Sequence, residues 1–170
     1  MKKLFALMLA LCLMLGCTAL ADTDISWEQV APLLEANGVT GQWYTFEQIA
    51  VAIFIPDGLA PAELPDESYI GYFAAEDGSA VAVQYVNVDG MDLETYAAAL
   101  PDAGATGIEA GTVNGLPCVS YDLAESNAMC VAFTTQMGYI LEAVVAPVAD
   151  DNAKLAASVI LASIQAVEAE

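Results

Sequence analysis

The stretch IEAGTVNGLPCVSYDLAESNAMCVAFTTQMGYILEAVV, residues 108–145, decides the fold of this chain. It contains four apolar runs, which are separated by turn segments at 114–115, 125–127 and 136–138. Asn114-Gly115 is the strongest of these turn signals, because both residue types tolerate the positive φ angles of a type I′ turn. The stretch therefore predicts a four-stranded antiparallel meander, against which the rest of the chain must pack.

Hairpins and helices are predicted on both sides of the meander. Runs rich in β-branched and aromatic residues predict two further hairpins, 41–46 with 49–55 and 69–75 with 80–88. Capping residues and helical spacing of apolar side chains predict helices at 27–36, 93–100 and 150 to about 167. The segment 59–68, which contains two prolines, is expected to be a loop. Segregated hairpins with few helices indicate an α+β fold, an antiparallel sheet covered by helices.

The first 21 residues have the pattern of a secretory signal peptide. Two lysines precede a continuous apolar core, which is shorter than the roughly 20 residues needed to span a bilayer. Ala19-Leu20-Ala21 fits a cleavage site, which would leave residues 22–170 as a single secreted domain. The alternative is a lipoprotein box ending at Cys17, in which case a lipid on Cys17 would anchor the protein to the cell envelope. We expect no other contact with a membrane.

The charge balance excludes nucleic-acid binding. The chain has 23 acidic residues, and Lys154 is the only basic side chain outside the leader. Nucleic acids and anionic lipids both require clustered lysine or arginine, so such a surface repels them. The chain also contains no histidine, which removes the Ser-His and Cys-His nucleophile pairs and most zinc ligand sets. These features predict a protein that is not an enzyme.

Cys118 and Cys130 are the two cysteines that remain after the leader. They lie on consecutive predicted strands at positions of equal parity, so an even register would place them opposite each other. An oxidising compartment permits a disulfide between them. Two half-buried free thiols are the alternative, because sequence alone does not determine the register of neighbouring strands.

Two sets of side chains are candidates for binding. The loop carboxylates form a weak candidate calcium site, since this ion prefers oxygen ligands from loops, and without calcium no cofactor is expected. This set is Asp57, Glu63, Asp66 and Glu67. Aromatic residues in predicted strands could stack on a ligand or partner, or pack in the core. This set is Trp43, Tyr44, Tyr69 and Tyr72, of which the adjacent first two must point to opposite faces.

Several motifs resemble the PsbP-like superfamily, which includes an extrinsic photosystem subunit, a Ran-binding import factor and DcrB-type bacterial envelope proteins. They are IAVAIFIPDGL at 49–59, Val113-Asn114-Gly115, Gly138-Tyr139-Ile140-Leu141, and the ending Ile160-Leu161-Ala162-Ser163-Ile164. The resemblance covers most of the chain after the leader and implies an α/β/α sandwich with a non-enzymatic accessory role. All of the shared motifs are structural, so fold-level analogy carries little about function.

Together these features predict an exported bacterial domain that binds a partner protein or a small ligand at the cell envelope. Two alternatives remain open: a small extracellular hydrolase that uses carboxylates, and a structural surface protein that associates with itself. An enzyme would need a concave site with a carboxylate of raised pKa, whereas a binding module can present a flat or grooved sheet face.

Overall fold

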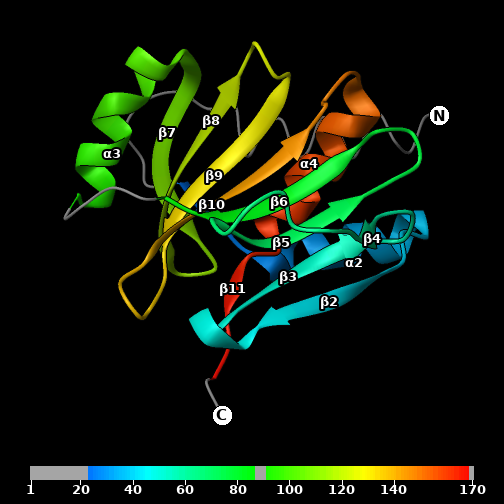
Figure 1. Ribbon diagram of the computed structural model, residues 1–170. Coiled ribbons are helices and arrows are strands. Elements are labelled where there is room, and N and C mark those ends of the chain that lie inside the picture. The colour runs from blue at the N-terminus through cyan, green and yellow to red at the C-terminus, as the bar shows by residue number, and fades with distance from the viewer. Residues whose placement is uncertain (1–22, 87–90, 169–170) are drawn as a thin grey trace.

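The computed structural model describes residues 23–86 and 91–168, so the predicted leader and Cys17 lie outside the described residues (Figure 1). The predicted meander is present as four consecutive antiparallel strands. These are β7 (Ala105–Val113), β8 (Leu116–Leu123), β9 (Ala128–Thr134) and β10 (Ile140–Ala146). Asn114 and Gly115 join the first pair with φ angles of 47° and 80°, as a type I′ turn requires.

The meander forms half of an eight-stranded sheet with the order β1-β7-β8-β9-β10-β6-β5-β4. The added strands are β1 (Thr23–Ile25), β4 (Ala60–Pro61), β5 (Tyr69–Ala74) and β6 (Ala80–Tyr85). All neighbours are antiparallel except β1, which runs parallel to β7. The predicted loop 59–68 thus contributes β4 to one edge, and the residues just after the predicted leader form the other edge.

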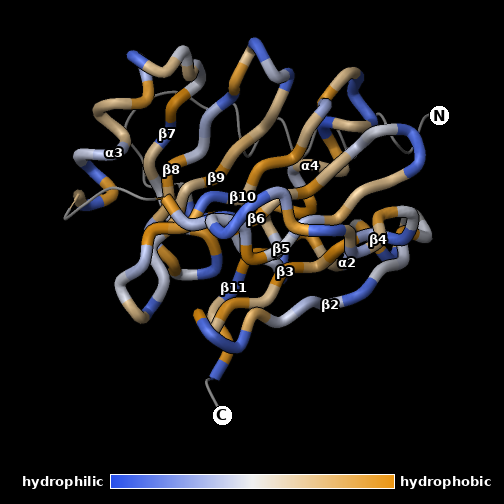
Figure 2. The backbone as a smooth tube through the Cα atoms, viewed as in Figure 1, coloured by the Kyte–Doolittle hydropathy of each residue, from blue (hydrophilic) through white to orange (hydrophobic). Residues whose placement is uncertain are grey.

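A second sheet of three strands lies against one face of the large sheet. Its order is β11-β3-β2, with β2 (Gly41–Phe46), β3 (Val51–Pro56) and β11 (Gln165–Ala166). A 3-10 turn over Glu47–Ile49 joins β2 to β3. The main core lies between the two sheets, and its largest fully buried side chains include Ile53, Ile55, Val81, Val83, Phe133 and Leu141. Figure 2 shows this concentration of hydrophobic residues on the central strands and of hydrophilic residues at the turns.

Within residues 23–86 and 91–168, three helices pack on the sheets without covering them completely. They are α2 (Trp27–Asn37), α3 (Leu93–Ala99) and α4 (Asp151–Ala162). α4 shares the main core with the small sheet, whereas α2 packs outside, through Val30 and Leu34 against Phe54. α3 packs on the opposite face of the large sheet. The result is a mixed α and β fold dominated by its sheets. Within residues 23–86 and 91–168, no helix is both long and apolar enough to cross a membrane.

The last helix ends earlier than its apolar spacing predicts. The Ser163 hydroxyl accepts a hydrogen bond of 2.9 Å from the Phe54 backbone N–H and donates one of 2.6 Å to the Ile160 carbonyl. The chain then continues as β11, which pairs with β3. The prediction of a helix to about residue 167 was therefore wrong, because pairing with a distant strand replaces the last helical turn.

The cysteines do not face each other. Cys118 pairs with Phe133, and Cys130 pairs with Tyr121, so the two thiols lie on opposite faces of the large sheet as free cysteines. The even register that a disulfide would need does not occur, because residue numbers of paired positions in β8 and β9 have opposite parity, so the alternative of two free thiols holds. Burial raises the pKa of Cys118 to about 11 and that of Cys130 to about 12.

Candidate functional site

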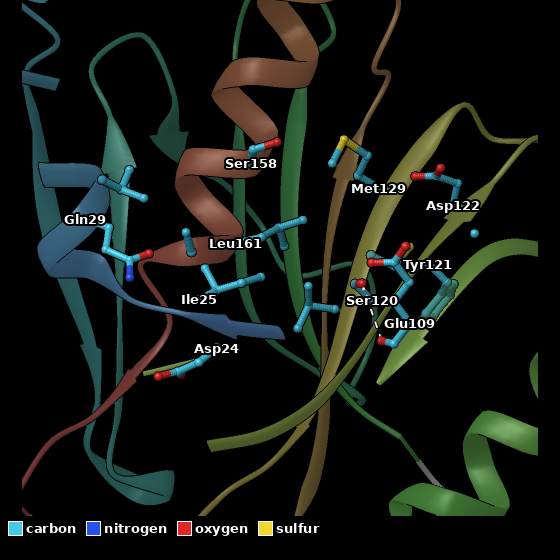
Figure 3. Close-up of a pocket in the computed structure, with 15 residues that line it drawn as sticks. Asp24, Ile25, Gln29, Glu109, Ser120, Tyr121, Asp122, Met129, Ser158 and Leu161 are labelled. Carbon is cyan, nitrogen blue, oxygen red and sulfur yellow. Dashed lines mark hydrogen bonds between the residues drawn. The ribbon is translucent and has the colours of Figure 1, made fainter. Parts of the chain in front are cut away.

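A cleft of about 310 Å³ lies on the side of the large sheet that carries α4 (Figure 3). Residues of β7, β8 and β9 line it from the large sheet, and residues of α4, β1 and the start of α2 form the rest of its lining. In Figure 3, Ser158 and Leu161 of α4 face the strands that carry Met129, Ser120 and Asp122. The volume is at the lower end of the roughly 300–1,000 Å³ typical of small-molecule sites.

The surface of the cleft is mainly apolar. Its apolar lining residues are Ile25, Val30, Met129, Val131, Leu161 and Ala162. Its uncharged polar residues are Gln29, Ser120, Ser158 and Tyr121, of which the last has its hydroxyl hydrogen-bonded to Glu142. Ser120 and Ser158 already donate hydrogen bonds to the carbonyls of Glu109 and Lys154, at 3.5 Å and 2.9 Å. The cleft therefore offers a ligand a mainly apolar surface with few free hydrogen-bond donors.

Carboxylates supply the charge of the cleft. Glu109 pairs with Ser120 across β7 and β8, and Asp122 lies two residues further along β8, so all three side chains lie on the cleft side of the sheet. Both acids are exposed. Asp24 also lines the cleft, but its carboxylate accepts a hydrogen bond of 2.6 Å from Thr112. Among the residues that the structure describes, the lining contains no basic side chain, and Lys154, one turn before Ser158, is exposed on α4.

The side chain of Asn114 is hydrogen-bonded to both α2 and the end of α4. Its Oδ1 accepts a hydrogen bond of 2.6 Å from the backbone N–H of Trp27, at the start of α2. Its Nδ2 donates to the carbonyls of Ala162 and Ile164, at 2.9 Å and 2.7 Å, at the end of α4. One turn residue of the meander thus connects the start of α2 to the end of α4, and residues of both helices line the cleft.

A buried polar cluster occupies the opposite face of the sheet, under α3. Glu142 of β10 is only 8% exposed, and it accepts hydrogen bonds from the Tyr121 hydroxyl, from Gln84 Nε2 at 2.5 Å and from the Tyr96 hydroxyl at 3.5 Å. Burial, and then the charge of Glu142, raise the pKa of Tyr121. Burial also raises the pKa of Tyr96. The cluster is fully hydrogen-bonded and closed, so its evident role is to attach α3 to the sheet.

The predicted aromatic set is divided among three places. Trp43 is 41% exposed on the outer face of the small sheet, where its ring lies 5.0 Å from that of Trp27. Tyr44 points inward and packs on Phe73 at 4.6 Å, so the two neighbours do point to opposite faces, as predicted. Tyr69 and Tyr72 lie on β5 of the large sheet, with their ring centroids 6.4 Å apart. The structure therefore does not assemble these four residues into one site.

The predicted calcium ligands are not assembled either. In the described part of the chain, no three carboxylate or other metal-binding side chains lie close enough to share an ion. Asp57 accepts a hydrogen bond of 2.5 Å from the Thr40 hydroxyl. Asp66 accepts hydrogen bonds from the hydroxyl and the N–H of Ser68, which lower the pKa of its carboxyl. Glu63 and Glu67 are exposed residues of the same loop.

Sequence reasoning missed the residues that the structure brings together. Glu109 and Asp122 did not stand out, because acids are common throughout this chain. Glu142 could have been noticed, since it is a single acid within the apolar run ILEAVVA of β10. A lone charge inside a buried strand indicates a specific set of hydrogen-bonding partners.

Comparison with known proteins supplies no family. No protein-family model matches the chain, and no curated protein matches it. A crystal structure of a protein from Bacteroides thetaiotaomicron VPI-5482 is similar with a TM-score of 0.46 and 13% sequence identity. The similarity covers 75% of this chain and 49% of that protein, so the chain spans about half of its length. A similarity at this level carries no inference about function.

Proposed function

We propose that this protein is a non-enzymatic binding domain whose cleft holds a small molecule with an apolar body and a cationic group. The observation that carries the proposal is the pairing of a mainly apolar cleft with two exposed carboxylates, Glu109 and Asp122, and no basic residue in its lining. Apolar walls favour burial of hydrocarbon, and unpaired carboxylates favour a positive charge at the mouth. A cationic amphiphile fits both features.

The surroundings of the cleft strengthen the electrostatic part of the proposal. The whole chain has a formal net charge of −20, so cations are attracted from a distance and anions are repelled. In the described residues, neither Glu109 nor Asp122 has a side-chain hydrogen-bonding partner, which leaves both carboxylates available to a ligand. Such attraction weakens with salt, because the screening length falls to about 10 Å at 0.1 M.

Binding is favoured over hydrolysis by the exposure of the same carboxylates. A catalytic acid generally occupies an enclosed, apolar position that keeps it protonated, as in glycoside hydrolases. Glu109 and Asp122 are instead exposed lining residues. Glu142 is enclosed, but it lies on the other face of the sheet and its oxygens are bonded to Tyr121, Tyr96 and Gln84.

The wider proposal is an exported accessory protein of a bacterial envelope with a PsbP-like sandwich. The layering of α3, the large sheet, and α4 with the small sheet supports the sandwich reading. Detection of the processed protein in medium or in envelope fractions by mass spectrometry separates release after Ala21 from lipidation at Cys17.

A titration with n-octylamine, followed by amide NMR spectra, tests the cleft. We expect shifts concentrated at Ser120–Asp122, Met129–Val131 and Ser158–Ala162, and weaker binding at higher salt. Matched titrations with n-octanol and octanoate separate the contributions of the apolar body and the charge. The proposal predicts the affinity order octylamine, octanol, octanoate. If octylamine produces no localised shifts, or if octanoate binds as tightly as octylamine, the proposal is wrong.

Two variants and one control sharpen this test. Replacing both Glu109→Gln and Asp122→Asn should weaken octylamine binding about 3- to 10-fold, since exposed ion pairs each contribute about 0.2–1 kcal/mol. Ser158→Trp should fill the cleft and abolish binding of octanol as well. The control pair Glu63→Gln and Glu76→Gln removes the same charge from exposed sites outside the cleft lining, so it should change binding far less.

A further inference from the structure

The two sheets have four edges among the described residues, and three of them are protected against pairing with another chain. The large sheet ends in β1, three residues long and containing Asp24, and in β4, two residues long and containing Pro61. One edge of the small sheet is β11, which is two residues long. Short strands, charges and proline are the devices by which proteins prevent edge-to-edge association.

The fourth edge, β2, lacks all of these devices. Its six residues, GQWYTF, include no charge and no proline, and its pairing with β3 is regular along its whole length. Gln42, Trp43 and Thr45 are exposed. Figure 1 shows β2 at the lower boundary of the molecule, with no described element beyond it. In a chain with a net charge of −20, an uncharged edge of this length is an exception.

The hydrogen-bond pattern shows which groups of β2 point outward. The N–H of Phe54 donates to Ser163, on the side of β3 away from β2, so the opposed pair Trp43 and Phe54 is not hydrogen-bonded. Pairs of an antiparallel ladder alternate between bonded and non-bonded. The N–H and C=O groups of Gly41, Trp43 and Thr45 therefore point to the free edge.

From this edge we propose that β2 pairs with β2 of a second copy of the chain, antiparallel and around a twofold axis at Trp43. This register uses all of the outward-pointing groups: Trp43 pairs with its own counterpart, and Gly41 pairs with Thr45 of the partner subunit. Strands related by this axis keep equivalent side chains on the same face, so the two small sheets become one continuous sheet. The two exposed Trp43 rings then lie next to each other and shield each other from water.

Charge selects a second copy over a basic partner. β2 offers no carboxylate with which lysine or arginine could pair, whereas it matches another uncharged strand. The nearest charges flank the strand: Glu47 follows it, and Asp57 lies beside Thr40. In the dimer, Glu47 of the partner subunit approaches Asp57, which is repulsive. Screening by salt should therefore strengthen the association, whereas contact with a basic partner would weaken in salt.

Sedimentation velocity of the protein exported and processed by a bacterial host tests the proposal. We expect a monomer–dimer equilibrium in which the dimer fraction rises with protein concentration and with sodium chloride. Thr45→Pro removes an outward N–H without removing a bond to β3, and proline is tolerated at such an edge position. Each dimer then loses two hydrogen bonds, so its dissociation constant should rise about tenfold or more.

Thr45→Val is the matched control, because it keeps the N–H and the β-branched shape. It should dimerise as the parent does, and circular dichroism should show that both variants are folded. Glu47→Gln should tighten the dimer at low salt. A monomer under all conditions, a dimer that dissociates as salt rises, or a dimer that a folded Thr45→Pro variant still forms would each overturn the proposal. Because β2 lies outside the cleft, octylamine binding should persist in Thr45→Pro.

Discussion

The ring of Phe46, at the end of β2, lies directly on Gly71 of β5 and joins the small sheet to the large one. A Cβ atom at position 71 would lie 2.7 Å from both Cε1 and Cζ of this ring. Real Cβ atoms do not approach other heavy atoms so closely. The absence of a side chain at position 71 is therefore a condition for the packing of the two sheets.

Gly71→Ala should lower the free energy of unfolding by about 1–3 kcal/mol, because overpacking a core displaces its neighbours. Urea unfolding followed by circular dichroism measures the change. A double variant with Phe46→Leu should be less destabilised than the sum of the two single variants, since a smaller side chain leaves room for the methyl group. If the two changes in unfolding free energy simply add, the added methyl group at position 71 does not clash with the Phe46 ring.

Asn114→Gly should be strongly destabilising although glycine suits the turn. The variant keeps the positive φ but loses the side-chain hydrogen bonds to Trp27, Ala162 and Ile164. We expect the free energy of unfolding to fall by about 2–4 kcal/mol, since each buried group left without its hydrogen-bonding partner costs roughly 1–3 kcal/mol. Asn127→Gly is the control, because Asn127 also has a positive φ, of 50°, but its side chain is exposed. Equal effects at both positions would contradict the anchoring role of Asn114.

Tyr121→Phe should cost about 1–3 kcal/mol of stability, because it removes a hydroxyl donor from the buried carboxylate of Glu142. Protection of α3 amides in hydrogen exchange should fall together with global stability. Tyr44→Phe provides the comparison, since the Tyr44 ring packs on Phe73 in the main core. If both substitutions are equally mild, the cluster around Glu142 contributes little to the attachment of α3.

Alkaline conditions should destabilise the protein through its two thiols. Burial raises their pKa values from 9.0 to about 11 for Cys118 and about 12 for Cys130, so the folded state retains protons that the unfolded chain releases. Their contribution to stability is complete below pH 9 and is lost as the pH rises through 11 to 12. Urea midpoints across this range measure the loss. A Cys118→Ala, Cys130→Ala variant should show a weaker pH dependence, with the raised pKa of Tyr121 still contributing above pH 10.

The same thiols should resist alkylation in the native protein. A pKa of about 11 in place of 9.0 lowers the thiolate fraction of Cys118 about 100-fold at neutral pH, and burial restricts access further. Iodoacetamide should therefore add to both cysteines only after denaturation. The intact mass of the exported protein should carry the full complement of thiol hydrogens, whereas a mass lower by two hydrogens would show a disulfide.

Local sequence signals predicted most of the individual elements. Asn114-Gly115 forms the predicted turn, and Asp92 and Asp150 cap helices through hydrogen bonds to backbone N–H groups. These signals succeed because the chemistry lies within a few residues of the element that it defines. Ser26 is the exception, since it precedes α2 without a side-chain capping bond.

Pairing between distant segments could not be predicted in this way. β1 and β11 are too short to show a periodic pattern, and each is a strand only because a partner about 90 or more residues away in the chain is present. The separation of the hairpin 41–55 into its own sheet has the same origin, because its apolar face fits the core formed by β6, β9 and β10. The cleft depends on these placements, so Glu109 and Asp122 had no local signal that could mark them.

The bonds of Asn114 also determine when the fold can close. The backbone N–H of Trp27 is hydrogen-bonded to Asn114, 87 positions later, and the Asn114 side chain is hydrogen-bonded to carbonyls 48 and 50 positions further along the chain. Because a ribosome releases the chain from its N-terminus, the connection of α2 to α4 through Asn114 cannot form until Ala162 and Ile164 have emerged. A chain that ends before Ala162 lacks both carbonyl partners of Asn114, so the C-terminal segment completes the connection between the two helices that line the cleft.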